Sequence, residues 1–405
     1  MSFSETSPKL SVTRRVTVRS SGERSGSQPK ACATVIQLIV GLAPMDGVTD
    51  AAFRWMVAKY GKPDVVYTEF VNVEGLMRGR IERLLPVLIY DEIERPIVAQ
   101  LFGKTPEDFY RATVLVCELG FDGVDINMGC PAKNVAQKGM GAGLIKTPDL
   151  AQEIVRMVKK AVKDWSEGRV GLEEVAPDEK WLKIVGDFKT FILNSRKTAD
   201  CRKNAFLTSQ GSVPLSSKNR LPIPVSVKTR LGVEEDVSQW WMEVLSEVEP
   251  ATIVLHGRTL KQMYSGEADW EAIGRAGEVV KKKGIVFLGN GDVKSVQGAK
   301  LKVQKYGVDG VLVGRASFGR PDIFADSYIG SEPIYDDDMY RFRTYTWMVE
   351  HSRKYEELFG KGRFLPMRKH LAWYARGFPG AKELRAKLVQ CSSAEEVEKL
   401  VMSDW

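Results

Sequence analysis

Cys130 lies on a loop that directly follows an apolar strand pattern. The strand pattern ends at Asn127, and the thiol comes three residues later, between a glycine and a proline. In α/β barrels, the side chains just beyond the C-terminal ends of the strands carry the chemistry. A buried cysteine is nevertheless more often a small apolar packing residue. Both interpretations stay open on this loop alone, and the residues at the other strand ends have to separate them.

The other predicted strand ends carry residue types that hold a phosphorylated ring. Glycines let a backbone approach a phosphate closely, and barrels commonly bind phosphate after their last two strands, where Arg315 adds a bidentate anion partner. Lys228 can stabilise negative charge on a reduced ring, and amides match the mixed donors and acceptors of a flavin or pyrimidine edge. Lys228 could instead pair with a carboxylate, and His256 could be a core histidine. The candidate cofactor-binding residues are Ala43, Pro44, Met45, Gln100, Lys228, His256, Asn290, Gly291, Asp292, Gly314 and Arg315.

Eight short apolar runs, each followed by a helical pattern, would position these residues. Strands buried on both faces read as continuous apolar runs, as these do, and Thr-Pro starts at Thr105 and Thr147 mark two of the helices. The predicted strands are Leu38–Ala43, Val65–Glu69, Ile97–Phe102, Gly123–Asn127, Val225–Lys228, Thr252–His256, Ile285–Gly289 and Gly310–Val313. Eight β-then-α units predict a (β/α)8 TIM barrel over residues 36–330, with a doubly wound sheet as the alternative.

Three segments fall outside that pattern. About sixty residues separate the helix ending near Val162 from the strand at Val225, which predicts an insertion over about 164–221. Residues 1–35 hold eight Ser and six Lys/Arg and predict a flexible tail, whether a targeting segment, an untargeted extension or a wrongly assigned start. Residues 331–405 carry helical patterns and predict a C-terminal helical domain.

Charge and composition narrow the class of protein. The net charge of +7 is concentrated between Arg341 and Gln390, where twelve Lys/Arg face four Asp/Glu. Such a segment indicates either a docking surface for a polyanion or a solvated helical face. The five cysteines form no CxxC pair, which argues against structural zinc and secreted disulfides and predicts no metal. No apolar run approaches the roughly 18–20 residues of a membrane span, so a cytosolic protein is expected.

Together these motifs resemble the tRNA-dihydrouridine synthases, which are FMN-dependent reductases of uridines in tRNA. The resemblance covers roughly residues 40–163 and 222–390, and Met367–His370 with Gly377–Gly380 looks like the bacterial B-type subgroup. The insertion and the N-terminal tail depart from the family pattern. The matching runs are Leu42–Asp50, Asp125–Pro131, Lys138–Ala142, Val225–Gly232 and His256–Thr259, extended by Gln262, Tyr264, Gly266 and Ala268–Trp270.

The resemblance implies a chemistry and a set of partners. NADPH or NADH would reduce FMN, the flavin would pass hydride to C6 of a uracil, and Cys130 would protonate C5, which requires a thiol that stays protonated. Asn127 and Arg258 would contact the substrate. We expect a monomeric enzyme that docks tRNA on its helical domain through Arg363, Arg368, Lys369 and Arg376. One competing interpretation is an FMN barrel that reduces a free small molecule of the dihydroorotate or enoate type. A third interpretation, without catalysis, is an RNA-binding module that retains a degenerate barrel.

Overall fold

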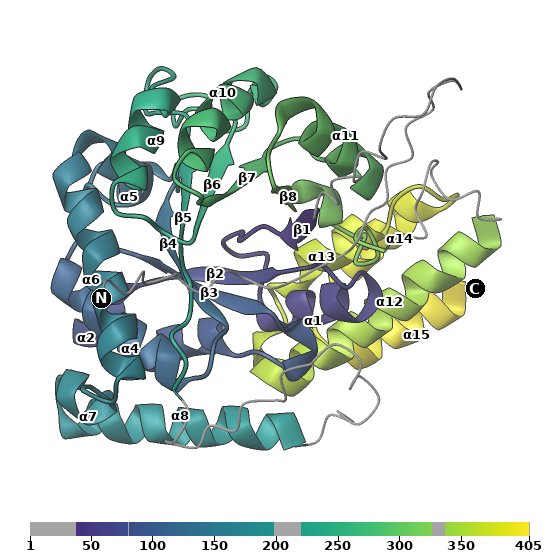
Figure 1. The fold of residues 1–405 in the computed structure, drawn as a ribbon. Coiled ribbons are helices and arrows are strands. Elements are labelled where there is room, and N and C mark those ends of the chain that lie inside the picture. The colour runs from purple at the N-terminus through teal and green to yellow at the C-terminus, as the bar shows by residue number, and fades with distance from the viewer. Residues whose placement is uncertain (1–37, 80, 198–219, 326–336, 405) are drawn as a thin grey trace, which may run out of the picture.

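The computed structural model describes residues 38–79, 81–197, 220–325 and 337–404, and its centre is a closed barrel of eight parallel strands (Figure 1). Each strand pairs with its sequence neighbour, and β8 closes the ring on β1. This confirms the predicted (β/α)8 barrel and excludes the doubly wound sheet. The strands are β1 Ile39–Leu42, β2 Val66–Asn72, β3 Ile97–Phe102, β4 Gly123–Met128, β5 Val225–Arg230, β6 Thr252–His256, β7 Val286–Asn290 and β8 Gly310–Val313.

Helices surround the strands, as Figure 1 shows. The largest apolar cluster fills the space between strands and helices, and a smaller one includes Val254, Leu288 and Leu312. Side chains alternate along a strand, so Val254, Leu288 and Leu312 point in the same direction as the strand-end residues two positions later. The polar residues at the strand ends therefore lie above an apolar layer inside the barrel. The barrel helices are α1 Ala51–Tyr60, α2 Val73–Arg78, α3 Ile81–Leu84, α4 Pro106–Glu118, α5 Lys133–Ala136, α6 Pro148–Ser166, α9 Ser238–Ser246, α10 Trp270–Lys281 and α11 Val296–Tyr306.

Helices α4 and α6 begin where the Thr-Pro signals predicted. Pro106 and Pro148 occupy the first turn, where a missing N–H costs nothing. Thr105 and Thr147 occupy the N-cap positions of these helices, but neither accepts a capping hydrogen bond through its side chain. The Thr147 hydroxyl donates to the Leu144 carbonyl instead.

The predicted insertion contains two helices in the residues described here, α7 Leu172–Val175 and α8 Glu179–Lys197. Helix α8 is attached to the barrel by Trp181, whose indole donates to the Leu76 carbonyl, and by Lys189, which pairs with Glu118. Residues 198–219 of the insertion, the predicted tail over 1–35 and most of the linker before α12 lie outside the described residues.

The C-terminal region consists of helices, as predicted: α12 Asp337–Phe359, α13 Met367–Tyr374, α14 Ala381–Leu388 and α15 Ala394–Asp404, with a 3-10 turn at Lys361–Arg363. They share an apolar cluster of their own, which also includes Ala52 and Met56 of α1. In Figure 1 these helices lie beside α1, next to the β1 and β8 side of the barrel. The helical region is therefore packed on the barrel through the helix that follows the first strand.

Candidate active site

Asn127 fixes the loop that carries Cys130. Its Oδ1 accepts hydrogen bonds from the backbone N–H of Gly129 at 3.0 Å and of Cys130 at 2.8 Å. From the neighbouring strand β5, Arg230 Nε donates to the Gly129 carbonyl at 2.7 Å. The loop is thus clamped on both sides of residue 129, and the buried thiol projects from a backbone with little freedom.

Behind Asn127, a chain of buried polar side chains crosses three strands. Asn127 Nδ2 donates to Gln100 Oε1 at 3.0 Å, and Gln100 Nε2 donates to Asp125 Oδ2 at 2.7 Å. The Ser226 hydroxyl donates to the other Asp125 oxygen at 2.5 Å. Burial raises the pKa of Asp125 to about 6, although the hydrogen bonds from Ser226 and Gln100 oppose the shift. The ionised carboxylate orients Gln100, and Gln100 in turn orients Asn127.

Sequence reasoning did not assign Asp125 a role, although a signal was present. Asp125 and Asn127 are two residues apart in a strand that is otherwise apolar, so both side chains face the barrel interior. The same alternation places Ser226, Lys228 and Arg230 on one face of β5. Polar residues at period two in a buried strand therefore identify the interior of the site.

The Cys130 thiol is held in its protonated form. Burial raises its pKa above the ordinary value, and the negative charge of Asp46 adds to the effect. The positive charges of Arg230 and Lys228 act in the opposite direction without reversing the shift. A thiol in this state is protonated at neutral pH rather than a nucleophilic thiolate, which is the form that the resemblance leads us to expect.

Lys228 on β5 and His256 on β6 are polar groups of the two strands that follow this loop. Burial, followed by repulsion from Arg230, lowers the pKa of Lys228 to about 8. Within the part of the chain that the structure describes, the Lys228 ammonium has no hydrogen-bond or ion-pair partner, so the interpretation of a pair with a barrel carboxylate finds no support. Burial and then the charge of Lys228 lower the pKa of His256, which is therefore neutral. A lone half-buried ammonium fits the electron-rich edge of a flavin ring.

Arg258 is more enclosed than its predicted role in substrate contact suggests. Its guanidinium pairs with Asp292 at 2.7 Å and donates to the carbonyls of Ser265 and Gly266. Its Nη1 is buried and has no hydrogen-bond partner among the described residues. The side chain thus orders the loop after β6, and one donor stays available.

The ends of β7 and β8 form the cradle predicted for a phosphate. Gly291 has a φ of +123°, and a Cβ there would meet Ala268 Cβ at 2.6 Å, so only glycine fits. Gly314 also has a backbone conformation outside the ordinary regions. Arg315 is exposed, lies 3.3 Å from Asp292 and stacks on the Tyr264 ring at 5.1 Å. An open arginine beside two glycine turns fits a phosphate group.

Asn290, Ala43, Pro44 and Met45 complete the predicted cofactor-binding residues. Asn290 Nδ2 donates to the Leu312 carbonyl at 2.8 Å and joins β7 to β8. Met45 exchanges two hydrogen bonds with the Thr49 hydroxyl, its N–H donating at 3.0 Å and its carbonyl accepting at 3.2 Å. The loop between β1 and α1, residues 43–50, is called the β1 loop. The two hydrogen bonds join its two halves, and it lies beside the cradle, where Met45 sulfur approaches Gly314.

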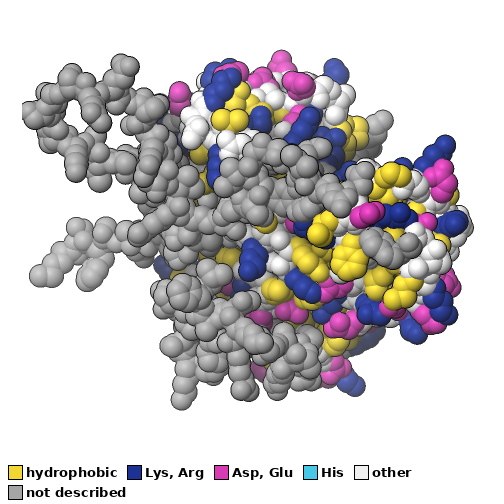
Figure 2. Space-filling view, turned by 90° about the vertical axis from the view of Figure 1, so that its right-hand side faces the viewer, with side chains coloured by type: hydrophobic (Ala, Val, Ile, Leu, Met, Phe, Trp, Pro, Cys, Tyr) yellow, Lys and Arg dark blue, Asp and Glu magenta, His cyan; other side chains and the backbone are white. Residues whose placement is uncertain are grey.

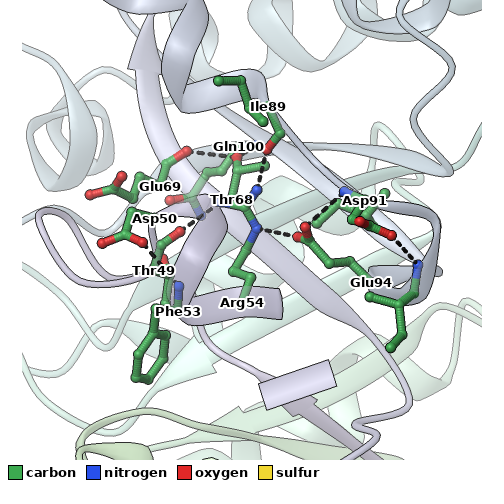
Figure 3. A network of polar contacts seen from close by, with 12 residues as sticks. Thr49, Asp50, Phe53, Arg54, Thr68, Glu69, Ile89, Asp91, Glu94 and Gln100 are labelled. Carbon is green, nitrogen blue, oxygen red and sulfur yellow. Dashed lines mark hydrogen bonds and ion pairs between the residues drawn. The ribbon is translucent and has the colours of Figure 1, made fainter. Parts of the chain in front are cut away.

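Arg54 holds the β1 loop by hydrogen bonds, and the sequence did not reveal this role (Figure 3). The guanidinium is fully buried and donates to Glu94 Oε2 at 2.6 Å, to the Thr49 carbonyl at 2.7 Å and to the Ile89 carbonyl. Burial raises the pKa of Glu94 to about 7, even though Arg54 acts to lower it. The pair joins the β1 loop to the segment that precedes β3.

The four cations predicted to dock tRNA do not form one open face. Arg368 donates to the carbonyls of Cys391 at 2.8 Å and Gln390 at 2.9 Å, and Arg376 donates to the Phe318 carbonyl. Arg363 is exposed in the 3-10 turn, and Lys369 lies against the β1 loop. On the side of the molecule that carries these helices, Lys/Arg are interspersed with Asp/Glu and apolar side chains (Figure 2).

One group of possible metal ligands exists among the described residues. Asp50, His351 and His370 each bring a donor atom within 4.8 Å of the others. His370 Nε2 lies 3.2 Å from Asp50 Oδ2, and His351 Nδ1 lies 3.1 Å from the Tyr374 hydroxyl. The three residues join α1, α12 and α13, so they connect the barrel with the helical region.

No helix in the described ranges is both long enough and apolar enough to cross a membrane. The family model described as "Dihydrouridine synthase (Dus)" matches residues 41–170 and 216–404. The break between these two ranges falls within the predicted insertion.

Curated relatives match over most of the chain. A "Probable tRNA-dihydrouridine synthase" of Staphylococcus aureus strain COL is 30% identical over 372 residues, covering 89% of this chain and 91% of that protein. "Probable tRNA-dihydrouridine synthase 2" of Bacillus subtilis strain 168 is 31% identical over 381 residues, covering 89% and 92%. An old yellow enzyme homologue from Zymomonas mobilis matches with a TM-score of 0.41, 12% identity and coverage of 74% and 91%, a likeness too weak to carry an argument. The family match and the two relatives show that the chain belongs to the dihydrouridine synthase family.

Proposed function

We propose that this protein is a tRNA-dihydrouridine synthase that uses FMN and a nicotinamide dinucleotide, with Cys130 as the proton donor. The observation that carries the proposal is a buried, protonated thiol on a loop clamped by Asn127 and Arg230, in a chain of this family. A reduction of the uracil C5–C6 bond needs a hydride at C6 and a proton at C5. This thiol is suited to the second of these.

The residues present fit FMN. The glycine turns at Gly291 and Gly314 with the open Arg315 would hold its phosphate, and the unpaired Lys228 ammonium would face the ring. Bound FMN would supply the hydride after its own reduction by NADPH or NADH. Lys228 and the neutral His256 would offer hydrogen bonds to the bound ring or to the uracil, and the apolar layer below them would exclude water.

The names of two relatives support tRNA as the substrate, since both are called probable tRNA-dihydrouridine synthases. A uridine must leave its stack to reach a thiol inside a barrel mouth, and flipping a base costs a few kcal/mol. Contacts between phosphates and the helical region would offset that cost. Reduction of a free small molecule would leave this region without a role. A cytosolic, monomeric enzyme that holds no metal remains our expectation.

The test is to incubate the purified protein with tRNA from cells that lack dihydrouridine, adding NADPH or NADH. We expect dihydrouridine in the digested tRNA, measured by mass spectrometry, and its position is then found by sequencing. The relative rates with the two dinucleotides identify the reductant. A flavin-loaded protein that leaves tRNA unchanged but reduces a free enoate or an orotate would contradict the proposal.

A further inference from the structure

We propose that Lys369 forms a phosphate subsite at the rim of the barrel, which binds the RNA backbone next to the uridine that enters the active site. The inference rests on the proposed function and makes one part of it specific. It assigns the helical region a direct contact with the target nucleotide, in addition to any docking of the tRNA body. The ligand is a phosphodiester group, and the element that receives it is the β1 loop.

The position of the Lys369 ammonium is the first support. Its Nζ lies 3.6 Å from the point that a Cβ on Gly47 would occupy, so the side chain reaches from α13 onto the β1 loop. Asp46 and Gly47 form the exposed tip of that loop, and Met45 on the same loop approaches Gly314. The ammonium is therefore located where the barrel mouth meets the helical region.

The second support is that this position lies close to the thiol. Lys369 acts electrostatically on Asp46, and Asp46 acts electrostatically on Cys130. Lys369 and Cys130 thus both lie within electrostatic range of one exposed carboxylate. A uracil placed at Cys130 leaves its ribose and phosphates at the mouth, on the solvent side of the thiol, where a cation on the rim can reach them.

The third support is that Lys369 is uncommitted, whereas its neighbours are not. Among the residues that the structure describes, the Lys369 ammonium has no hydrogen-bond or ion-pair partner. Arg368 next to it and Arg376 on the same segment donate to the carbonyls of Gln390, Cys391 and Phe318. Of the predicted docking cations, Lys369 is the one that combines a free charge with a place at the mouth.

A buried clamp holds Lys369 in place. The next residue, His370, is fully buried, and its Nε2 lies 3.2 Å from Asp50 Oδ2. The other Asp50 oxygen accepts from the Phe53 N–H at 3.0 Å and caps α1. Burial acts to raise the pKa of Asp50, but the hydrogen bond from His370 lowers it, so the carboxylate is ionised, while burial lowers the pKa of His370 and keeps the imidazole neutral. The clamp thereby connects α13 with the first turn after the β1 loop.

Asp46 is the competing partner for the Lys369 charge. The two lie within electrostatic range, but no ion pair forms between them at 4.0 Å or less. If neutralising Asp46 were the role of Lys369, removing the carboxylate would make the lysine dispensable. A phosphate contact instead predicts a requirement for Lys369 whether or not Asp46 is charged. The two roles therefore give opposite results in an Asp46→Asn background.

The experiment compares Lys369→Met with Lys382→Met, which removes an exposed lysine of α14. Methionine keeps the apolar stem of lysine and removes the charge, so the fold is preserved, which a melting curve verifies. Both variants and the wild type receive tRNA in which one phosphate flanking the target uridine is an uncharged methylphosphonate. Single-turnover rates of dihydrouridine formation are measured across salt concentrations.

We expect Lys369→Met to lower the rate at subsaturating tRNA by roughly tenfold or more, as for loss of a charge-assisted hydrogen bond. The slope of log affinity against log salt should fall by about 0.7–0.9. One methylphosphonate position should slow the wild type and Lys382→Met, yet have no further effect on Lys369→Met.

Two outcomes would overturn the subsite. Methylphosphonate penalties that are the same in Lys369→Met as in the wild type would show that no flanking phosphate contacts this lysine. A defect of Lys369→Met that disappears in the Asp46→Asn background would assign the lysine to Asp46. If the wild type forms no dihydrouridine in any tRNA, the proposed function fails instead, which separates the two failures.

Discussion

In the mouth of the barrel, the Lys228 ammonium and Nη1 of Arg258 have no partner among the described residues, whereas in the helical region Arg368 donates to two backbone carbonyls and Arg376 to one. Both regions are rich in positive charge. In the barrel, Lys228 projects from β5 and Arg258 from the loop that follows β6, and the sheet fixes the register of these two adjacent strands. In the helical region, Arg368 and Arg376 donate to backbone carbonyls that lie just beyond the ends of other helices.

This difference indicates where ligands bind. A cation whose donors have no partner can give them to a ligand, because an unsatisfied buried donor is costly. A cation that already donates to carbonyls stabilises its own helices and has fewer donors left for a phosphate. Net charge along the sequence therefore overestimates the surface that is open to RNA, and the geometry of each cation has to decide.

Replacing the thiol should have the largest effect and would test the barrel side of the comparison. We expect Cys130→Ala to keep FMN but lose about 10²–10⁴ in dihydrouridine formation, the usual contribution of a general acid. Because the pKa of Cys130 is raised above its ordinary value of 9.0, titration of the thiol should lower the wild-type rate only above about pH 9, whereas loss of the Lys228 charge should lower it from about pH 8 in the wild type and in the variant alike. Single-turnover rates between pH 6 and 10 measure both effects.

Cys117→Ala, which removes a core thiol of α4, is the control. A Cys130→Ala rate within threefold of the wild type would remove the thiol from the mechanism.

Removing the open arginine of the phosphate cradle should have an intermediate effect. Arg315→Ala is expected to weaken FMN binding by roughly 10–100-fold, the equivalent of one charge-assisted contact, while the fold persists. Flavin absorbance per mole of purified protein and a titration with FMN measure the loss. Arg275 is 53% exposed against 52% for Arg315 and pairs weakly with Asp236, so Arg275→Ala is a matched control. Equal flavin content in the two variants would contradict the assignment.

Removing a committed cation of the helical region should have the smallest effect on RNA. Arg368→Ala loses two hydrogen bonds to carbonyls and should destabilise the protein by about 0.5–1.5 kcal/mol for each, while tRNA affinity changes less than about threefold. Thermal melting measures the loss of stability, and tRNA titration at two salt concentrations measures the change in affinity. Arg363→Ala, an exposed arginine, should leave the melting temperature unchanged. Strong loss of tRNA binding by Arg368→Ala would remove the distinction between committed and open cations.

The sequence predicted the scaffold well because each strand is a local signal. Buried parallel strands read as short apolar runs, and the turn residues after them can be recognised one strand at a time. The glycine turns at Gly291 and Gly314 were predictable for the same reason, since a backbone that approaches a phosphate needs glycine. The fold class, the order of the strands and the helical character of the C-terminal region all followed.

What the sequence did not predict depends on partners far along the chain. Arg54 looks like an ordinary residue of an amphipathic helix, and its burial is decided by Glu94, forty residues away. Arg368 looked free because its carbonyl partners, Gln390 and Cys391, lie beyond the next helix, α14. The hydroxyls of Thr105 and Thr147 occupy capping positions but make no capping bond, since occupancy of a position does not fix a rotamer. Sequence patterns locate elements, and tertiary contacts decide which charges remain open.

The contact between His370 and Asp50 has a consequence for how this architecture can change over time. Asp50 caps the first helix of the barrel with one oxygen and faces the helical region with the other, so neither unit can rotate on its neighbour without disturbing the loop beside the thiol. A new preference for another nucleotide would have to arise from exchanges of surface residues, because tilting the appended helices is blocked. The same coupling limits protein engineering: a transplanted helical region would have to carry its own match for this carboxylate.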